Sequence, residues 1–191
     1  ISGVPLNTAG RLVARFFFYL SCIPLFVISR SLGFPGRRAL VPLILFLASP
    51  IYLFWSRQFM NESLPVFFGL AYVASVLTWE KNQSAVSLLL SLFLGAIAAL
   101  SKSTTYATFG LIACLILGAT LLRKRKLTAT WLLQSATILL IPLLVGAGWV
   151  VYSDHIKSLN PLAAGLMTSS AQGRWYLYSG WTQFASKDLW N

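Results

Sequence analysis

Six long stretches of this sequence are almost free of ionisable residues, and this feature limits the possible fold more than any other. They cover residues 12–29, 39–56, 63–79, 84–101, 103–122 and 130–152. A helix that crosses a bilayer needs about 20 apolar residues, and a charged side chain at its centre costs roughly 2.5 to 3.5 kcal/mol. Arg15 lies near the start of the first stretch, where it can extend its guanidinium group to the membrane surface. We therefore predict an all-α, polytopic bundle of about six transmembrane helices.

The composition of the stretches supports helices over strands. They are rich in Leu, Phe, Ala and Ile and show no alternation of apolar and polar residues, which argues against an outer-membrane barrel. Pro24, Pro50 and Pro142 lie inside them, and neighbouring helices can satisfy the carbonyl groups that a proline leaves free. Only 10% of the residues are charged, against about a quarter in ordinary soluble domains.

The basic residues lie between the apolar stretches and predict the orientation of the bundle. Eight of them fall in the connections on one side, namely Arg30, Arg37, Arg38, Lys81, Arg123, Lys124, Arg125 and Lys126. The short connections on the other side contain only Arg57 and Lys102. Because cytoplasmic loops carry the excess of Lys and Arg, we place the first side in the cytoplasm. The net charge of +11 is thus explained by topology, and we expect no nucleic-acid partner.

We expect two regions, a membrane bundle over residues 1–153 and an extracytoplasmic interfacial segment over 154–191. The second contains Trp175, Trp181 and Trp190 among Ser, Gln and Asn, which suits an interfacial aromatic belt or a sugar-stacking surface. The sequence begins with Ile1, and we expect it to be a fragment of a longer protein. The common phosphate-binding loops, zinc motifs and hydrolase motifs are absent from it. We expect no required cofactor, and metal dependence stays open.

Glu62 is the strongest candidate for acid or base chemistry among the four acidic residues. It lies at the outer mouth of the turn between the second and third apolar stretches, five residues after Arg57. A structural explanation also exists, because Asn61 can cap the third helix and Glu62 can interact with the positive end of its dipole. Both interpretations stay open at this stage.

Arg57 and Lys102 are candidates for binding a phosphate at the membrane surface. Each lies at the end of a long apolar stretch on the outward side, where a cation can stabilise the charge of a leaving phosphate. Either residue can also be a simple interfacial anchor. His155, the single histidine, lies at the outward face, although a lone histidine there is commonly just solvated. We predict that Arg57, Asn61, Lys102 and His155 bind substrate, and that Arg57, Glu62 and Lys102 converge.

One pattern of residues resembles a known family of membrane enzymes. It comprises Gly10-Arg11-Leu12-Val13-Ala14-Arg15, Ser49-Pro50, Tyr52, Arg57, Glu62, Leu64 and Leu100-Ser101-Lys102. Their order and spacing resemble the membrane glycosyltransferases of the GT-C fold. Within these, the pattern is most similar to family 39, which includes the protein mannosyltransferases, the aminoarabinose transferases that act on lipid A, and the Rgt-like group.

The resemblance implies an inverting glycosyltransferase. Such an enzyme takes a sugar from a polyprenyl-phosphate donor and transfers it to a lipid, glycan or protein acceptor outside the cytoplasm. It also implies that the main catalytic base precedes Ile1, that Glu62 holds the second acidic position, and that Arg57 and Lys102 face the carrier phosphate. We expect an integral protein of a bacterial inner membrane with a periplasmic active face. The alternatives are a transporter or flippase, and a non-catalytic membrane subunit.

Overall fold

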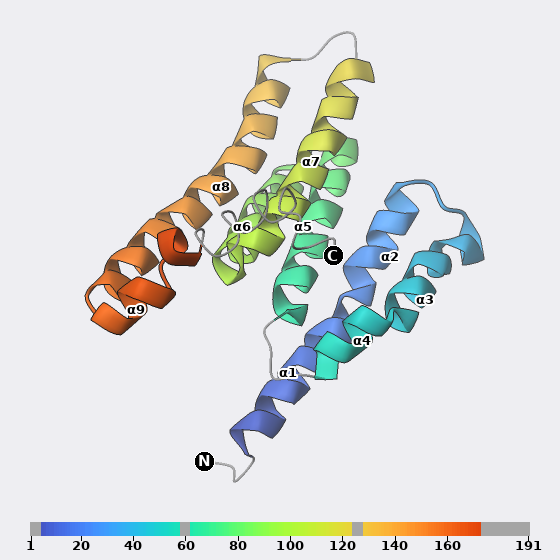
Figure 1. Cartoon of the computed structure of the whole chain (residues 1–191). Helices are drawn as coiled ribbons and strands as arrows, with labels where there is room; N and C mark the ends of the chain where they lie inside the picture. Colours follow the sequence, from blue (N-terminus) through green and yellow to red (C-terminus); the bar gives the residue numbers. More distant parts are fainter. Residues whose placement is uncertain (1–4, 58–61, 124–127, 173–191) are drawn as a thin grey trace, which may run out of the picture. The chain divides into compact units, whose positions relative to one another are not determined.

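The structure is a computed structural model that describes residues 5–57, 62–123 and 128–172, and within these residues every regular element is a helix (Figure 1). In chain order the elements are α1 (Leu6–Leu20), α2 (Cys22–Ser31), the 3-10 helix η1 (Gly36–Leu40), α3 (Val41–Ala48), α4 (Pro50–Arg57), α5 (Ser63–Asn82), α6 (Ala85–Ser101), α7 (Ser103–Arg123), α8 (Ala129–Ser158) and α9 (Pro161–Leu166). The chain divides into two compact units, Ile1–Gly146 and Ala147–Asn191, and α8 runs through the boundary between them.

Within the described residues, four helices are long and apolar enough to cross a membrane. They are Leu6–Ser31, which joins α1 to α2, and the helices α5, α7 and α8. The helix α6 is also apolar but has only 17 residues, which corresponds to about 25 Å at 1.5 Å per residue. The predicted all-α architecture is therefore confirmed for the described residues, with four helices that meet the length and hydropathy of a membrane span.

The second predicted span, residues 39–56, is divided into three short elements. Ser49 has an extended conformation between α3 and α4, with φ −64° and ψ 117°. The ring of Pro50 disfavours a helical conformation in the residue before it, and Pro50 lacks the amide that would continue the hydrogen bonds of α3. The apolar stretch therefore ends one helix at Ala48 and begins another at Pro50.

Helix α5 is the centre of the first unit, since it contacts α1, α2, α4, α6 and α7. Its buried side chains Tyr72, Val76 and Trp79 pack in one core with residues of α6, α7 and α8. Two glycines allow close approach: Gly69 packs against the ring of Phe109 on α7, and Gly95 on α6 packs against Pro142 and Tyr72. Apolar helices commonly pack through such small residues.

A polar contact joins each end of α5 to a neighbouring segment. At its C-terminal end, Lys81 donates a hydrogen bond of 2.6 Å to the carbonyl of Ser31, where α2 ends. At its N-terminal end, Glu62 forms an ion pair with Lys102, which lies between α6 and α7. With 20 residues, α5 separates these contacts by about 30 Å. The basic Arg123 ends α7, at the far end of that helix from Lys102.

The second unit contains the C-terminal part of α8 and the helix α9. Asn160 caps α9 by accepting a hydrogen bond of 3.0 Å from the amide of Leu162. Asp154 on α8 accepts the amide of Ser169 with both carboxylate oxygens, each at 3.1 Å. These bonds hold the segment after α9 against α8. Of the predicted interfacial segment 154–191, residues 173–191, which include Trp175, Trp181 and Trp190, lie outside the described residues.

Candidate functional site

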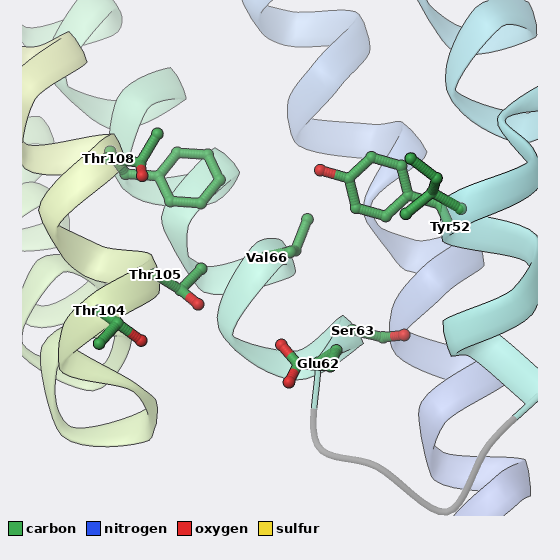
Figure 2. Close-up of a pocket in the computed structure, with 9 residues that line it drawn as sticks. Tyr52, Glu62, Ser63, Val66, Thr104, Thr105 and Thr108 are labelled. Carbon is green, nitrogen blue, oxygen red and sulfur yellow. The ribbon is translucent and has the colours of Figure 1, made fainter. Parts of the chain in front are cut away.

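A cavity of about 470 Å³ opens between α4, α5 and α7 in the first unit (Figure 2). Its lining residues are Ile51, Tyr52, Glu62, Ser63, Val66, Thr104, Thr105, Thr108 and Phe109. Most of these side chains carry a hydroxyl or carboxylate group, whereas Ile51, Val66 and Phe109 supply an apolar part. This volume lies within the range of small-molecule pockets, which combine apolar walls with a few polar groups.

Glu62 connects this cavity to Lys102. The ammonium group of Lys102 lies 2.5 Å from Oε1 of Glu62, and the side chains are 39% and 35% exposed, respectively. The two residues are separated by 40 positions in the sequence, and their pairing joins the start of α5 to the α6–α7 connection. An ion pair with this exposure remains accessible to a ligand from outside.

The position of Lys102 follows from the tight connection between α6 and α7. It is the single residue between the two helices, and its backbone is extended. Its amide donates to the carbonyl of Ala98 at 3.2 Å, and its carbonyl accepts from the amide of Tyr106 at 2.9 Å. Both backbone groups of Lys102 are hydrogen-bonded to the adjoining helices. The Cα atom from which its side chain extends is therefore held in place.

Glu62 immediately precedes α5 and occupies its N-cap position, with φ −88° and ψ −36°. Its side chain accepts a hydrogen bond from the ammonium group of Lys102 and makes no capping hydrogen bond to α5 within the described residues. A carboxylate at this position also interacts favourably with the positive end of the helix dipole. Asn61, predicted as a cap and as a substrate-binding residue, lies outside the described residues.

Three threonines of α7 form the polar wall of the cavity. Thr104, Thr105 and Thr108 lie in the first two turns of that helix, and Figure 2 shows them on the side facing Glu62 and Val66. In the part of the chain that the structure describes, their hydroxyl groups have no hydrogen-bond partner. These threonines were not identified in the sequence analysis. A run of hydroxyl residues directly after Lys102, at the start of an apolar helix, could have indicated a polar site there.

The hydroxyl group of Tyr52 on α4 points toward the space between Val66 and Thr108 in Figure 2. Its side chain is 39% exposed, so both the ring and the hydroxyl can contact a ligand. Tyr52 belongs to the pattern that resembles the glycosyltransferases, but the sequence alone assigned it no role. The cavity therefore has a tyrosine on one side and threonines on the other.

The structure brings two of the predicted site residues together, Glu62 and Lys102. Arg57 lines a second cavity of about 330 Å³ on α4, together with Pro50, Leu53 and Phe54. His155 is an exposed residue of α8 in the second unit. The substrate-binding roles of Arg57 and His155 stay predictions.

The cavity presents a carboxylate and unbonded hydroxyl groups at the N-terminal ends of two helices, and the ammonium group of Lys102 is paired with that carboxylate. Helices α5 and α7 both begin there, so their exposed amide groups and dipoles favour negative charge. Such a site can accept a proton at Glu62 and stabilise an anion at Lys102. Among the described residues, no three His, Cys, Asp or Glu side chains cluster to hold a metal ion.

Comparison with protein-family models, curated proteins and solved structures gave no match for this chain.

Proposed function

We propose that this protein is a membrane glycosyltransferase of the GT-C type. It transfers a sugar from a polyprenyl-phosphate donor to a lipid, glycan or protein acceptor on the extracytoplasmic side of the membrane. The observation that carries the proposal is the Glu62–Lys102 ion pair beside a hydroxyl-lined cavity. Such a transfer requires a cation for the leaving phosphate in addition to a base for the acceptor hydroxyl. In this proposal Lys102 is that cation and Glu62 orients it.

The position of the pair along the helices supports an extracytoplasmic site. Lys102 precedes α7, and Arg123, the first residue of the basic run 123–126, ends that helix. Because an excess of Lys and Arg marks the cytoplasmic side, the pair belongs to the opposite side. In this proposal α6 and the divided α3–α4 segment complete a bundle of about six spans in a bacterial inner membrane.

The proposed reaction is a single displacement at the anomeric carbon of the donor sugar. The acceptor hydroxyl loses its proton to a carboxylate as its oxygen forms the new glycosidic bond, and the bond to the phosphate oxygen breaks with its electron pair. The polyprenyl phosphate leaves with the added negative charge. Lys102 and the N-terminal end of α7 lie where they can stabilise this charge.

The carboxylate roles follow from the resemblance together with the geometry. The resemblance assigns the main base to a segment preceding Ile1 and gives Glu62 the second acidic position. The contact with Lys102 provides a physical basis for that position, since the Glu62 carboxylate orients the ammonium group. Lys102 has three N–H donors, so it can bind Glu62 and a phosphate oxygen at the same time.

The direct test is transfer of radiolabelled sugar from a polyprenyl-phosphate donor in membranes that contain the protein. Glu62→Gln and Lys102→Met should each reduce transfer by at least about tenfold while the protein stays in the membrane. Lys81→Met is the matched control, because Lys81 lies at the other end of α5 and should leave transfer unchanged. Unchanged transfer in both site variants would exclude the proposed role of the pair, and translocation of the lipid-linked sugar without transfer would support the transporter alternative.

A further inference from the structure

The lining of the larger cavity differs from what a phosphate or a lipid chain requires. Glu62 is the charged residue among those that line it, and Lys102 neutralises this carboxylate. A lipid chain would leave the hydroxyl groups of Thr104, Thr105 and Thr108 without partners. We infer that this cavity is the binding site for an uncharged sugar ring, with Tyr52, Thr105 and Thr108 as the residues that determine its specificity. The inference adds the class of sugar to the proposed function. It rests on that function for the statement that the bound sugar is the one transferred.

The first observation behind this inference is that the threonine hydroxyl groups in the cavity make no hydrogen bond within the described residues. Elsewhere in the described chain, Thr78 and Thr120 donate to carbonyl groups of their own helices, at 2.8 Å and 3.1 Å. Threonines in apolar helices commonly satisfy their hydroxyl groups in this way. For Thr105, the residue four positions earlier is Ser101, which belongs to the preceding helix, and Lys102 interrupts the helix between them. Thr108 has the carbonyl of Thr104 four residues earlier in α7, but makes no hydrogen bond to it in the described structure. The hydroxyl groups of Thr105 and Thr108 thus stay available to a ligand.

Two aromatic rings also line the cavity. Tyr52 on α4 and Phe109 on α7 both line the cavity, with Val66 of α5 as an apolar contact. A pyranose ring has apolar C–H faces and a rim of hydroxyl groups. The aromatic rings of the cavity can contact the faces, and its threonine hydroxyl groups can bond to the rim. The tyrosine hydroxyl can donate and accept at the same rim. The cavity therefore has the chemistry of a polyol site.

Charge decides between sugars of similar shape. Glu62 is the charged residue in the lining, and its partner Lys102 is not among the lining residues. An ammonium group on the sugar therefore finds a carboxylate that is already paired, and a carboxylate on the sugar meets a like charge. Moving an ion out of water without a partner is strongly unfavourable. An uncharged hexose ring should consequently bind more tightly than a hexuronate or an amino sugar of the same stereochemistry.

The experiment measures binding of three octyl glycosides, below their micelle concentrations, to the protein in lipid nanodiscs by saturation-transfer NMR. The probes are a hexose, the corresponding hexuronate and the corresponding 2-amino sugar. We expect the neutral glycoside to bind at least about tenfold more tightly than either charged one. Equal or tighter binding of a charged glycoside, or no saturable binding of any, would overturn the inference.

Three variants test the position of this site. Thr105→Val and Thr108→Val keep the side-chain shape and remove a hydroxyl group, so each should weaken neutral-glycoside binding about three- to tenfold. Thr120→Val is the matched control on the same helix, because the hydroxyl group of Thr120 donates to the carbonyl of Ile116. This variant should bind the neutral glycoside as tightly as the wild type does. Equal affinities for all three variants would also overturn the inference. The proposed transferase activity is judged separately, because Glu62→Gln affects transfer whether or not free glycosides bind.

Discussion

The hydroxyl group of Tyr72 donates a hydrogen bond of 3.1 Å to the backbone carbonyl of Ile138. This carbonyl precedes Pro142 by four residues in α8, where the missing proline amide leaves it without its usual helical donor. Tyr72 and Ile138 are both fully buried. A side chain of α5 thus replaces the backbone bond that the proline removes from α8.

Replacing Tyr72 with Phe should destabilise the first unit. The carbonyl of Ile138 would be buried without a donor, which costs about 1 to 3 kcal/mol. The free energy of unfolding in mixed micelles measures this loss. Tyr19→Phe is the control, because Tyr19 is 63% exposed. In a Pro142→Ala background, the restored amide can bond to Ile138, so Tyr72→Phe should have a smaller effect there; an equal effect in both backgrounds would contradict this account.

Gly69→Ala should be more disruptive than the same change at Gly118. A Cβ atom at Gly69 would overlap the ring of Phe109, whereas one at Gly118 meets no atom within 4 Å. Overpacking of a core typically costs about 1 to 3 kcal/mol, and Gly118→Ala should be neutral or slightly stabilising because alanine favours the helix. Phe109 also lines the larger cavity, so Gly69→Ala should weaken glycoside binding too. Equal stability of the two variants would show that the ring moves away freely.

Ser135→Ala should leave stability unchanged or raise it. Its buried hydroxyl group has no hydrogen-bond partner within the described residues. Ser91, which is also buried, donates to the carbonyl of Ser87 at 2.8 Å. Ser91→Ala should therefore lose about 0.5 to 1.5 kcal/mol. Thermal unfolding of the two alanine variants provides the comparison, and a larger loss for Ser135→Ala would point to a partner such as bound water.

Breaking the Glu62–Lys102 pair should affect function far more than folding. Since both side chains are more than a third exposed, solvent screening limits the contribution of the pair to about 1 kcal/mol or less. Glu62→Gln and Lys102→Met should accordingly unfold within a few degrees of the wild type. The double variant Glu62→Lys with Lys102→Glu tests whether the pair acts in function or in folding. It should restore the ion pair but not sugar transfer. A large loss of stability in either single variant would make the pair a structural element.

Asp154→Ala should release the segment after α9 in the second unit. The carboxylate accepts the amide of Ser169 through both oxygens and lies 3.8 Å from the ammonium group of Lys157. Hydrogen exchange should therefore become faster in residues 161–172. Lys157→Met is the control, since it removes the weaker contact and keeps the amide bonds. Faster exchange in that variant alone would contradict the assignment.

The helices could be predicted from the sequence because hydropathy and backbone preference act locally. The long apolar stretches predicted the helices of the bundle, and the fourth and fifth of them match α6 and α7 within one or two residues. Residues 39–56 were kept as one span in the sequence analysis, and the division at Ser49 was missed, although a proline restricts the residue before it. The length of the first apolar stretch, residues 12–29, did not predict the boundary between α1 and α2 at Ser21.

The sequence by itself determined that this chain forms apolar helices with basic residues concentrated toward one set of ends, since composition and charge depend only on which residues follow one another. Tertiary structure decided that Glu62 meets Lys102 and that Thr105 and Tyr52 share a cavity. These contacts depend on how closely the helices approach. That approach is set by small residues such as Gly69 and Gly95, through packing that no local pattern encodes.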